Sequence, residues 1–195
     1  MKKVKDFYFK KAKAKGFVAR SAFKLEEIDQ KNKILKPGMS VMDLGCFPGS
    51  WLQYISKKIG NSGLVLGVDL QDLQLPLTSN MRFIHSDINK LNLESIREIR
   101  PFFDLICSDM APKTSGIKGA DADRSYHLCQ LVLGISQQLL KHGGNTLMKV
   151  FQGAALEKLV QQMKNEYQAV KRIKPKSSRN ESVEIFILGV NKLKK

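Results

Sequence analysis

The chain has 195 residues, a mass of 22.0 kDa and 43% hydrophobic residues, which is enough to bury a core as one domain or at most two. It contains 33 Lys and Arg against 18 Asp and Glu, and the net charge of +15 favours a polyanionic partner; a lysine-rich surface without such a partner is the alternative. No run approaches the roughly 20 apolar residues of a membrane span, and Cys46, Cys107 and Cys129 stand apart, which excludes a membrane-spanning helix and a cysteine zinc cluster and favours free thiols.

The first segment is strongly basic. Residues 1–24 contain nine basic residues and one acid, Asp6. We therefore expect a basic extension over 1–20 in front of a domain over 21–195. The extension lacks the apolar centre of a secretory signal peptide. A weak organellar presequence is the alternative, but residues 1–16 contain no serine or arginine. The expected compartment is the cytoplasm.

From Ser21 onward the hydrophobic pattern alternates between helix and strand. Apolar residues at helical spacing, with Ser21 as N-cap, predict an amphipathic helix over 21–35. Gly60 and the pair Gly143-Gly144 are expected to end two later helices. Strands are predicted at 40–45, 63–70, 81–87, 102–112, 145–153, 167–175 and 182–192, and further helices at 50–60, 125–144 and 154–166.

Most of the predicted strands are continuous apolar runs separated by helices. This pattern is typical of a mainly parallel sheet that helices cover on both faces. The last two strands are joined by a short polar segment, which predicts an antiparallel hairpin at one edge. The expected fold is therefore a doubly wound, Rossmann-like α/β domain, in which ligands bind at the carboxyl ends of the strands.

The stretch DLGCFPGSW, residues 43–51, joins the first of these strands to the helix that follows. Gly45 and Gly49 bracket the turn, so its backbone can approach a ligand closely, and Trp51 offers a flat ring. The spacing is neither the G-x-G-x-x-G of dinucleotide sites nor a phosphate-binding P-loop, and Asp43 would repel a pyrophosphate. The turn favours a positively charged ligand; a simple tight turn is the alternative.

Three further acids follow the ends of predicted strands. Asp69 stands where a carboxylate can accept both hydroxyls of a ribose, and Asp87 and Asp109 end the next two strands. A single acid of this kind is usually a solvated loop residue or a helix cap. Together with Asp43, however, they converge on one rim of the sheet. S-adenosylmethionine carries a ribose, an adenine, an ammonium group and a sulfonium, so we expect this rim to bind it.

Three charged residues accompany this rim. Lys149 stands inside the apolar strand NTLMKVF, and lysine is rarely buried without a partner. Glu184 has the matching place in SVEIFIL, and Lys24 lies in the first helix. Taken one at a time, each can also be an outward-facing surface charge.

At this point the sequence resembles the FtsJ-like ribose 2′-O-methyltransferases. The similar motifs are ARSAFKLEEID, KPGMSVMDLGCFPGSWLQ, SDMAP, MKVFQG and SSRNESVEIFILG, which follow one another from about residue 17 onward. The chain departs from the family at Cys46-Phe47, where two small residues are usual, and at Ser50, where glycine is common. These departures concern the wall around the methionine part of the cofactor.

The resemblance implies a catalytic quartet of Lys24, Asp109, Lys149 and Glu184. It also implies S-adenosylmethionine contacts at Asp43, Gly45, Gly49, Trp51, Asp69, Asp87 and Asp109, and no metal. Lys149 is expected either to accept the proton of the ribose 2′-hydroxyl or to orient that hydroxyl as a charged group. Glu184 is expected to hold the lysines in place.

The substrate implied by the resemblance is a uridine of 23S ribosomal RNA in the 50S subunit, modified by a cytoplasmic monomer. The basic extension and the segment 171–179 are expected to bind RNA phosphates. Three alternatives stay open: a transfer-RNA methyltransferase of the same family, a non-catalytic RNA-binding assembly factor, and a nicotinamide oxidoreductase. The quartet argues against the second, and the lack of G-x-G-x-x-G argues against the third.

Overall fold

The computed structural model describes residues 2–179 and 181–194. Three residues lie outside the described part of the chain: Met1, at the start of the predicted extension, Lys195, at the end of the predicted domain, and Asn180, in the last motif. The helices are α1 (Lys2–Ala14), α2 (Ala22–Asn32), α3 (Ser50–Ile59), α4 (Leu93–Ile99), α5 (Lys118–Leu139) and α6 (Leu156–Lys164), with a 3-10 helix η1 (Ile88–Lys90). The strands are β1 (Ser40–Leu44), β2 (Leu64–Asp69), β3 (Met81–His85), β4 (Phe103–Ser108), β5 (Leu140–Phe151), β6 (Tyr167–Ile173) and β7 (Glu184–Lys192).

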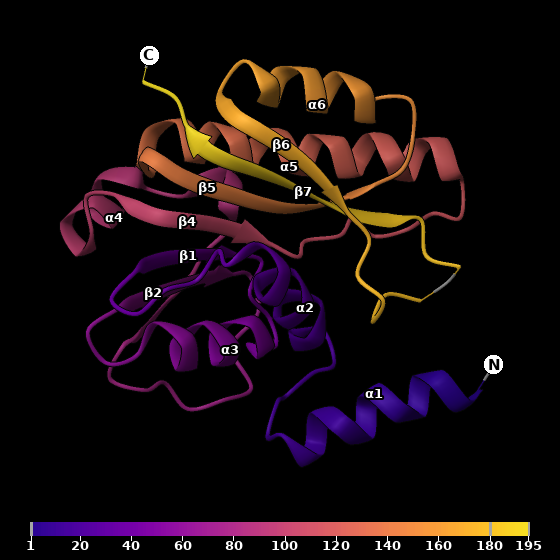
Figure 1. The fold of residues 1–195 in the computed structure, drawn as a ribbon, viewed down its shortest axis with the longest axis horizontal. Coiled ribbons are helices and arrows are strands. Elements are labelled where there is room, and N and C mark those ends of the chain that lie inside the picture. Colours follow the sequence, from indigo (N-terminus) through magenta and orange to yellow (C-terminus); the bar gives the residue numbers. More distant parts are fainter. Residues whose placement is uncertain (1, 180, 195) are drawn as a thin grey trace.

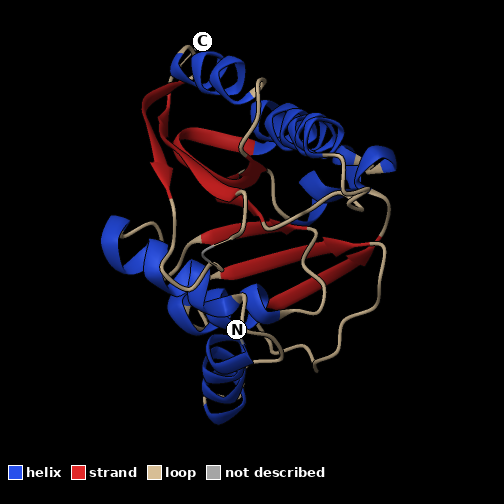
Figure 2. Ribbon diagram, turned by 90° about the vertical axis from the view of Figure 1, so that its right-hand side faces the viewer, coloured by secondary structure: helices blue, strands red, loops and turns tan. Residues whose placement is uncertain are grey.

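The strands form one seven-stranded sheet in the order β3-β2-β1-β4-β5-β7-β6 (Figures 1 and 2). The strands from β1 to β5 pair in parallel, whereas β7 runs antiparallel to both of its neighbours, β5 and β6. The predicted α/β fold with an antiparallel C-terminal edge hairpin is therefore confirmed. The strand order reverses at β1 and β4, and a crevice at such a point is the usual ligand site of an open α/β sheet.

Helices cover both faces of the sheet. On one face, Leu25 of α2 and Leu52 of α3 pack in a core with Val41 of β1. On the other, Val132 of α5 packs in a second core with Met42, the next residue along β1. Successive strand residues point to opposite faces, so an apolar residue is needed at every position of a strand that is covered on both sides. This explains the continuous apolar runs.

The segment 1–20 contains α1, which lies outside the two helical layers (Figure 1). It contacts α2 through Tyr8, whose ring centroid is 5.7 Å from that of Phe23, and through the buried Ala12. The division into a basic extension and a domain stays a prediction.

The prediction for the helix at 125–144 was wrong at both ends, because α5 begins at Lys118 and ends at Leu139. The expected helix stop, Gly143-Gly144, instead lies in β5, at the irregular start of its pairing with β4. A Cβ on Gly144 would come within 3.0 Å of the Asp104 carbonyl oxygen. Here glycine therefore permits a close approach of two strands, a use that looks the same in sequence as a helix end.

Three smaller expectations also need correction. The first domain helix ends at Asn32 and not at residue 35, and Ser21, although at its N-cap position, makes no capping hydrogen bond. The Ser21 hydroxyl instead lies 2.7 Å from that of Ser50. The strand predicted at 102–112 ends at Ser108, so Asp109 follows the strand and does not belong to it. Over residues 2–179 and 181–194, no helix combines the length and the apolar character needed to cross a bilayer.

Candidate active site

Strand alternation gathers three members of the predicted quartet, together with Asp43, on the sheet face that α2 and α3 cover, and α2 itself carries Lys24. On this face lie Val41, Cys107, Leu147 and Phe186. Residues two positions away along each chain segment share the face, and these are Asp43, Asp109, Lys149 and Glu184. Glu184 pairs with Phe151 at the carboxyl end of β5, because β7 runs antiparallel. The reversed strand thus brings its first residue to the rim where the parallel strands end.

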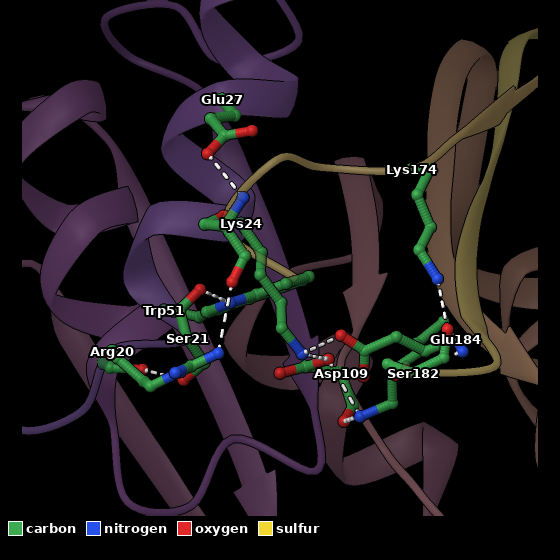
Figure 3. A network of polar contacts seen from close by, with 12 residues as sticks. Arg20, Ser21, Lys24, Glu27, Trp51, Asp109, Lys174, Ser182 and Glu184 are labelled. Carbon is green, nitrogen blue, oxygen red and sulfur yellow. Dashed lines mark hydrogen bonds and ion pairs between the residues drawn. The ribbon is translucent and has the colours of Figure 1, made fainter. Parts of the chain in front are cut away.

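The four quartet side chains form a connected set of ion pairs. Lys149 Nζ lies 2.9 Å from Asp109 Oδ1 and also donates to the Asp109 backbone carbonyl. Lys24 Nζ lies 3.7 Å from the same Asp109 oxygen and 2.8 Å from Glu184 Oε1. Figure 3 shows Lys24 reaching from α2 between Asp109 and Glu184. The Asp109 carboxylate therefore joins Lys149 and Lys24, and the Glu184 carboxylate also pairs with Lys24.

The charges of this set fix the protonation of Glu184. Burial alone would raise the pKa of the Glu184 carboxyl, but the positive charge and hydrogen bond of Lys24, with a further contribution from Lys149, hold that pKa below its usual value of 4.5. Glu184 is thus an anion at neutral pH. Lys24 Nζ also lies 5.7 Å from the centre of the Phe186 ring, which supports its stem.

Asp43 differs from the other acids of the rim. It is 1% exposed, and its Oδ2 has no hydrogen-bond partner among the described residues. Its Oδ1 has only the thiol of Cys107, at 3.7 Å. Burial, followed by the charge of Asp109, raises the pKa of the Asp43 carboxyl well above its usual value of 3.8. A buried carboxylate without a donor is costly, so this position suits a ligand that brings a positive charge.

A cavity of about 350 Å³ opens at the carboxyl ends of β1 to β4. Gly45, Asp69, Asp87 and Asp109 line it together with apolar side chains that include Leu128 of α5. A smaller cavity of about 30 Å³ shares Gly45 and Asp109 with it and reaches Asp43 and Trp51. The two cavities therefore run from the ribose-type acids to the unpaired carboxylate. No three potential metal-ligating side chains cluster within 2–179 and 181–194.

The backbone orients the acids at the mouth of the larger cavity. Asp69 Oδ2 accepts the Phe47 N–H at 2.8 Å, and its Oδ1 accepts the Gln71 N–H at 2.9 Å. Asp87 caps η1 by accepting the backbone and side-chain N–H of Asn89, and the backbone bond is the main cause of its lowered pKa. Each carboxylate oxygen has a second lone pair, so both acids can still accept ligand hydroxyls.

The two glycines of the 43–51 turn make room for protein side chains. Both have left-handed backbone angles, with φ of 75° at Gly45 and 108° at Gly49. A Cβ would lie 2.2 Å from a Met110 atom at Gly45 and 2.0 Å from a Leu75 atom at Gly49. Gly45 also lines both cavities, whereas Gly49 is not among the residues that line them. The structure therefore gives Gly49 a packing reason that the sequence pattern did not suggest.

Trp51 is held from two sides. Its indole N–H donates to the Ser21 carbonyl at 3.0 Å, and its ring stacks on Phe186 with 5.9 Å between centroids. It is 3% exposed and lines only the smaller cavity. Ser50, one of the departures from the family, contacts the Ser21 hydroxyl and thereby ties α3 to the start of α2. Phe47, another departure, lines both cavities.

A third cavity, of about 430 Å³, adjoins the quartet on its outer side. We call it the outer cleft; Arg20, Ser21, Lys24, Arg179, Glu181, Ser182 and Glu184 line it. It shares Ser21 with the smaller cavity and contains both members of the Lys24–Glu184 pair. The quartet thus stands between a carboxylate-lined pocket and a cleft with arginines at its wall.

The loop that forms one wall of the outer cleft is clamped to α2. The Glu27 carboxylate accepts the backbone N–H of Lys176 at 2.6 Å and of Ser177 at 3.0 Å, and Arg20 donates to the Ser177 carbonyl at 3.2 Å (Figure 3). Glu27 lies three residues after Lys24 on α2, and Arg20 lies in the turn just before Ser21, the N-cap residue of that helix. The helix that carries Lys24 therefore also fixes the loop that leads into Glu184.

Sequence reasoning did not single out Arg20 or Glu27. Both lie inside the motif ARSAFKLEEID, and their spacing from Lys24 was the available signal. Their partners, however, lie about 150 residues further along the chain. Only the folded structure reveals that contact. The segment 171–179, predicted to bind RNA, contributes Arg179 to the outer cleft.

Comparison with known proteins places this chain among methyltransferases. The sequence profile described as FtsJ-like methyltransferase matches residues 17–192. A ribosomal RNA large subunit methyltransferase E of Bdellovibrio bacteriovorus is 48% identical, covering 96% of this chain and 97% of the relative. One from Desulfotalea psychrophila is 45% identical, covering 98% and 97%. The crystal structure of a candidate ribosomal RNA methyltransferase from Plasmodium falciparum superposes with a TM-score of 0.81 at 30% identity, over 92% of this chain and 100% of that one.

Proposed function

Since the chain belongs to the FtsJ-like methyltransferase family, and is a methyltransferase, we propose that it methylates a ribose 2′-hydroxyl of large-subunit ribosomal RNA. The target is a uridine of the assembled 50S subunit, and the methyl donor is S-adenosylmethionine. The names of the relatives support large-subunit ribosomal RNA as the substrate, and the family motifs support a ribose oxygen as the methylated atom. One observation carries the proposal: two lysines share the Asp109 carboxylate beside the buried, unpaired carboxylate of Asp43.

The residues of the two cavities fit S-adenosylmethionine. When bound, it supplies a methyl group activated by a sulfonium. Asp43, which lacks a donor among the described residues, is proposed to attract the cationic methionine part. Asp69 and Asp87 are proposed to accept the ribose hydroxyls, and apolar residues such as Leu128 to contact the adenine. Gly45, Gly49 and Trp51 are proposed to shape the turn against the ligand.

Lys149 is proposed to act on the hydroxyl of the substrate. A lysine ammonium has three N–H donors; Lys149 donates one to the backbone carbonyl of Asp109 and forms an ion pair with the Asp109 carboxylate. A donor remains for the ribose oxygen, which favours Lys149 as a charged group that orients this oxygen. The alternative role for Lys149 is that of the base that accepts the proton of the ribose 2′-hydroxyl.

The remaining quartet members are proposed to position these groups. Asp109 orients Lys149, while Glu184 holds Lys24 by the 2.8 Å ion pair. Such positioning can account for a large part of a rate acceleration, on the order of 7 kcal/mol in favourable cases. Arg20 and Arg179 in the outer cleft are proposed to bind RNA phosphates next to the reacting ribose.

The test is a methyl-transfer assay with labelled S-adenosylmethionine. Large ribosomal subunits, free ribosomal RNA and transfer RNA are incubated in parallel, and the products are digested to nucleosides. We expect label in a 2′-O-methyluridine from the subunits. Label on a base would contradict the chemistry, and label on transfer RNA alone would contradict the substrate. RNA binding without any transfer would identify the protein as a non-catalytic assembly factor.

A further inference from the structure

One side of α1 faces the rest of the protein. Tyr8, Lys11, Ala12 and Lys15 have the i, i+3, i+4, i+7 spacing of a single helix face. Tyr8 packs on Phe23 of α2, and Lys11 Nζ lies 5.0 Å from the centre of the same ring. Ala12 is 2% exposed. This face of α1 is therefore packed against other parts of the chain.

The two flanks of this face carry Phe7 and Phe9, and Phe7 contacts Tyr8 and Lys11 of the same helix, with 5.3 Å between the Phe7 and Tyr8 ring centres. Phe7 is 60% exposed and Phe9 is 62% exposed. At about 100° per residue, they flank the inner face on either side, and Lys10 and Lys13 lie between them on the outer side. We call these four residues the α1 outer face. A single exposed phenylalanine is ordinary, but two that frame a pair of lysines suggest a binding surface.

The charge around the α1 outer face selects its partner. Residues 7–20 contain Lys10, Lys11, Lys13, Lys15 and Arg20 and no acid. Such a surface repels basic proteins and attracts a polyanion. Lysine side chains can neutralise phosphates, and exposed aromatic rings stack on unpaired nucleobases, since every base has a π-face. Duplex RNA hides those faces within its own stack.

Helix α1 is also connected to the outer cleft through its inner face. The Tyr8 ring centre lies 5.9 Å from the Arg20 guanidinium, and Arg20 lines the cleft beside Lys24 and Glu184. Figure 1 shows α1 and the loop between β6 and β7 on the same side of the molecule. An RNA strand that leaves the cleft past Arg20 therefore meets α1 next.

We propose that Phe7 and Phe9 are a stacking platform for unpaired bases of the substrate RNA, with Lys10 and Lys13 on the neighbouring phosphates. The inference rests on the proposed function only in taking RNA as the polymer that binds to α1. It adds that the enzyme requires single-stranded nucleotides next to its target, and it assigns their recognition to two aromatic side chains outside the methyltransferase core.

The experiment measures the Kd for a single-stranded oligouridine and for a duplex RNA of equal length at several salt concentrations. In a Phe7→Ala/Phe9→Ala variant we expect binding of the single strand to weaken at least about tenfold, with an unchanged salt slope and little effect on the duplex. A Lys10→Ala/Lys13→Ala variant should instead flatten the slope, by about 0.7 for each phosphate that is no longer neutralised. Phe102→Ala is the matched control, because Phe102, just before β4, is 55% exposed.

A second readout reports stacking directly. Trp51 is the only tryptophan and is buried, so a Phe9→Trp substitution adds one exposed fluorophore. We expect oligouridine, but not the duplex, to quench it. Unchanged single-strand affinity in the double alanine variant, or equal losses for single strand and duplex, would overturn the inference. So would intact RNA affinity with lost binding to ribosomal subunits, which would identify a protein partner. These assays measure binding alone, so a protein that binds in this way but fails to methylate would contradict only the proposed function.

Discussion

The two sides of the quartet are built in different ways. On the cofactor side, the acids stand at the ends of neighbouring strands, and backbone N–H groups only two residues away orient Asp69 and Asp87. On the outer side, the cleft depends on contacts such as Glu27 to Lys176, which join segments 149 residues apart. The first half is local and acidic, whereas the second is long-range and basic. We therefore expect substitutions on the cofactor side to change the proposed cofactor binding, and substitutions on the outer side to change the proposed RNA binding.

The largest loss of activity is expected from a substitution of Lys149, which lies between the cofactor side and the outer side. In Lys149→Ala, methyl transfer should fall by at least about a thousandfold, because the group proposed to contact the reacting oxygen is removed. Binding of S-adenosylmethionine, measured by calorimetry, should stay within a few-fold of wild type. Lys164→Ala, in the exposed last turn of α6, is the control. Near-normal turnover in Lys149→Ala would remove Lys149 from the reaction.

On the cofactor side, Asp43→Asn should weaken S-adenosylmethionine binding about tenfold to a hundredfold, because a charged partner of the ligand is removed. The free enzyme should gain stability, because the substitution removes a buried carboxylate whose Oδ2 has no donor among the described residues. Calorimetry and thermal unfolding test the two effects. Tighter or unchanged binding together with lower stability would assign Asp43 to the core alone.

The pH dependence of stability should distinguish the carboxyls of Asp43 and Glu184. The pKa of Asp43 is raised in the folded state, so between its usual 3.8 and that raised value the native protein holds the extra proton. Its contribution to the free energy of unfolding therefore falls as pH rises. The pKa of Glu184 is lowered, so its contribution is present above 4.5 and is lost as pH falls. Comparing Asp43→Asn and Glu184→Gln with wild type, by urea unfolding from about pH 2 upward, should reveal slopes that change in opposite directions, with the Glu184 effect below its usual pKa of 4.5.

On the outer side, Glu27→Gln should lower turnover about tenfold and leave cofactor affinity unchanged. Glutamine has a single acceptor oxygen, so it cannot accept both the Lys176 and Ser177 amides with the carboxylate geometry. Hydrogen exchange of residues 174–179 should increase. Glu26→Gln is the matched control, because Glu26 pairs with Lys15 and does not contact the loop. Equal losses in both variants would attribute the effect to α2 stability.

The smallest effect is expected at the wall of the outer cleft. Arg179→Ala should weaken RNA binding a few-fold and reduce the salt slope by about 0.7 to 0.9, the value for one phosphate contact. A titration at several salt concentrations measures both. A weaker affinity with an unchanged slope would show that Arg179 contacts something other than phosphate.

The same contrast explains what the sequence could predict. Lys149 and Glu184 were recognisable because a charge within an apolar strand is unusual, and strand alternation then fixed their common face. Arg20 and Glu27 were not, because a charge on a helix surface is ordinary until its partner is known. Gly143-Gly144 misled the prediction of α5, since glycine serves a close strand approach and a helix end equally well. Gly49 indicated a ligand, yet the atom nearest to its missing Cβ belongs to Leu75.

The reversed direction of β7 has a consequence for how the enzyme is made. Every other strand precedes β7 in the chain, although β7 lies between β5 and β6 in the sheet. During synthesis from the N-terminus, the carboxylate that holds Lys24 therefore emerges after the other three quartet residues. Until β7 inserts, β5 and β6 each present an unpaired edge that can join another nascent chain. Completion of the catalytic site and protection of the sheet are thus the same folding event.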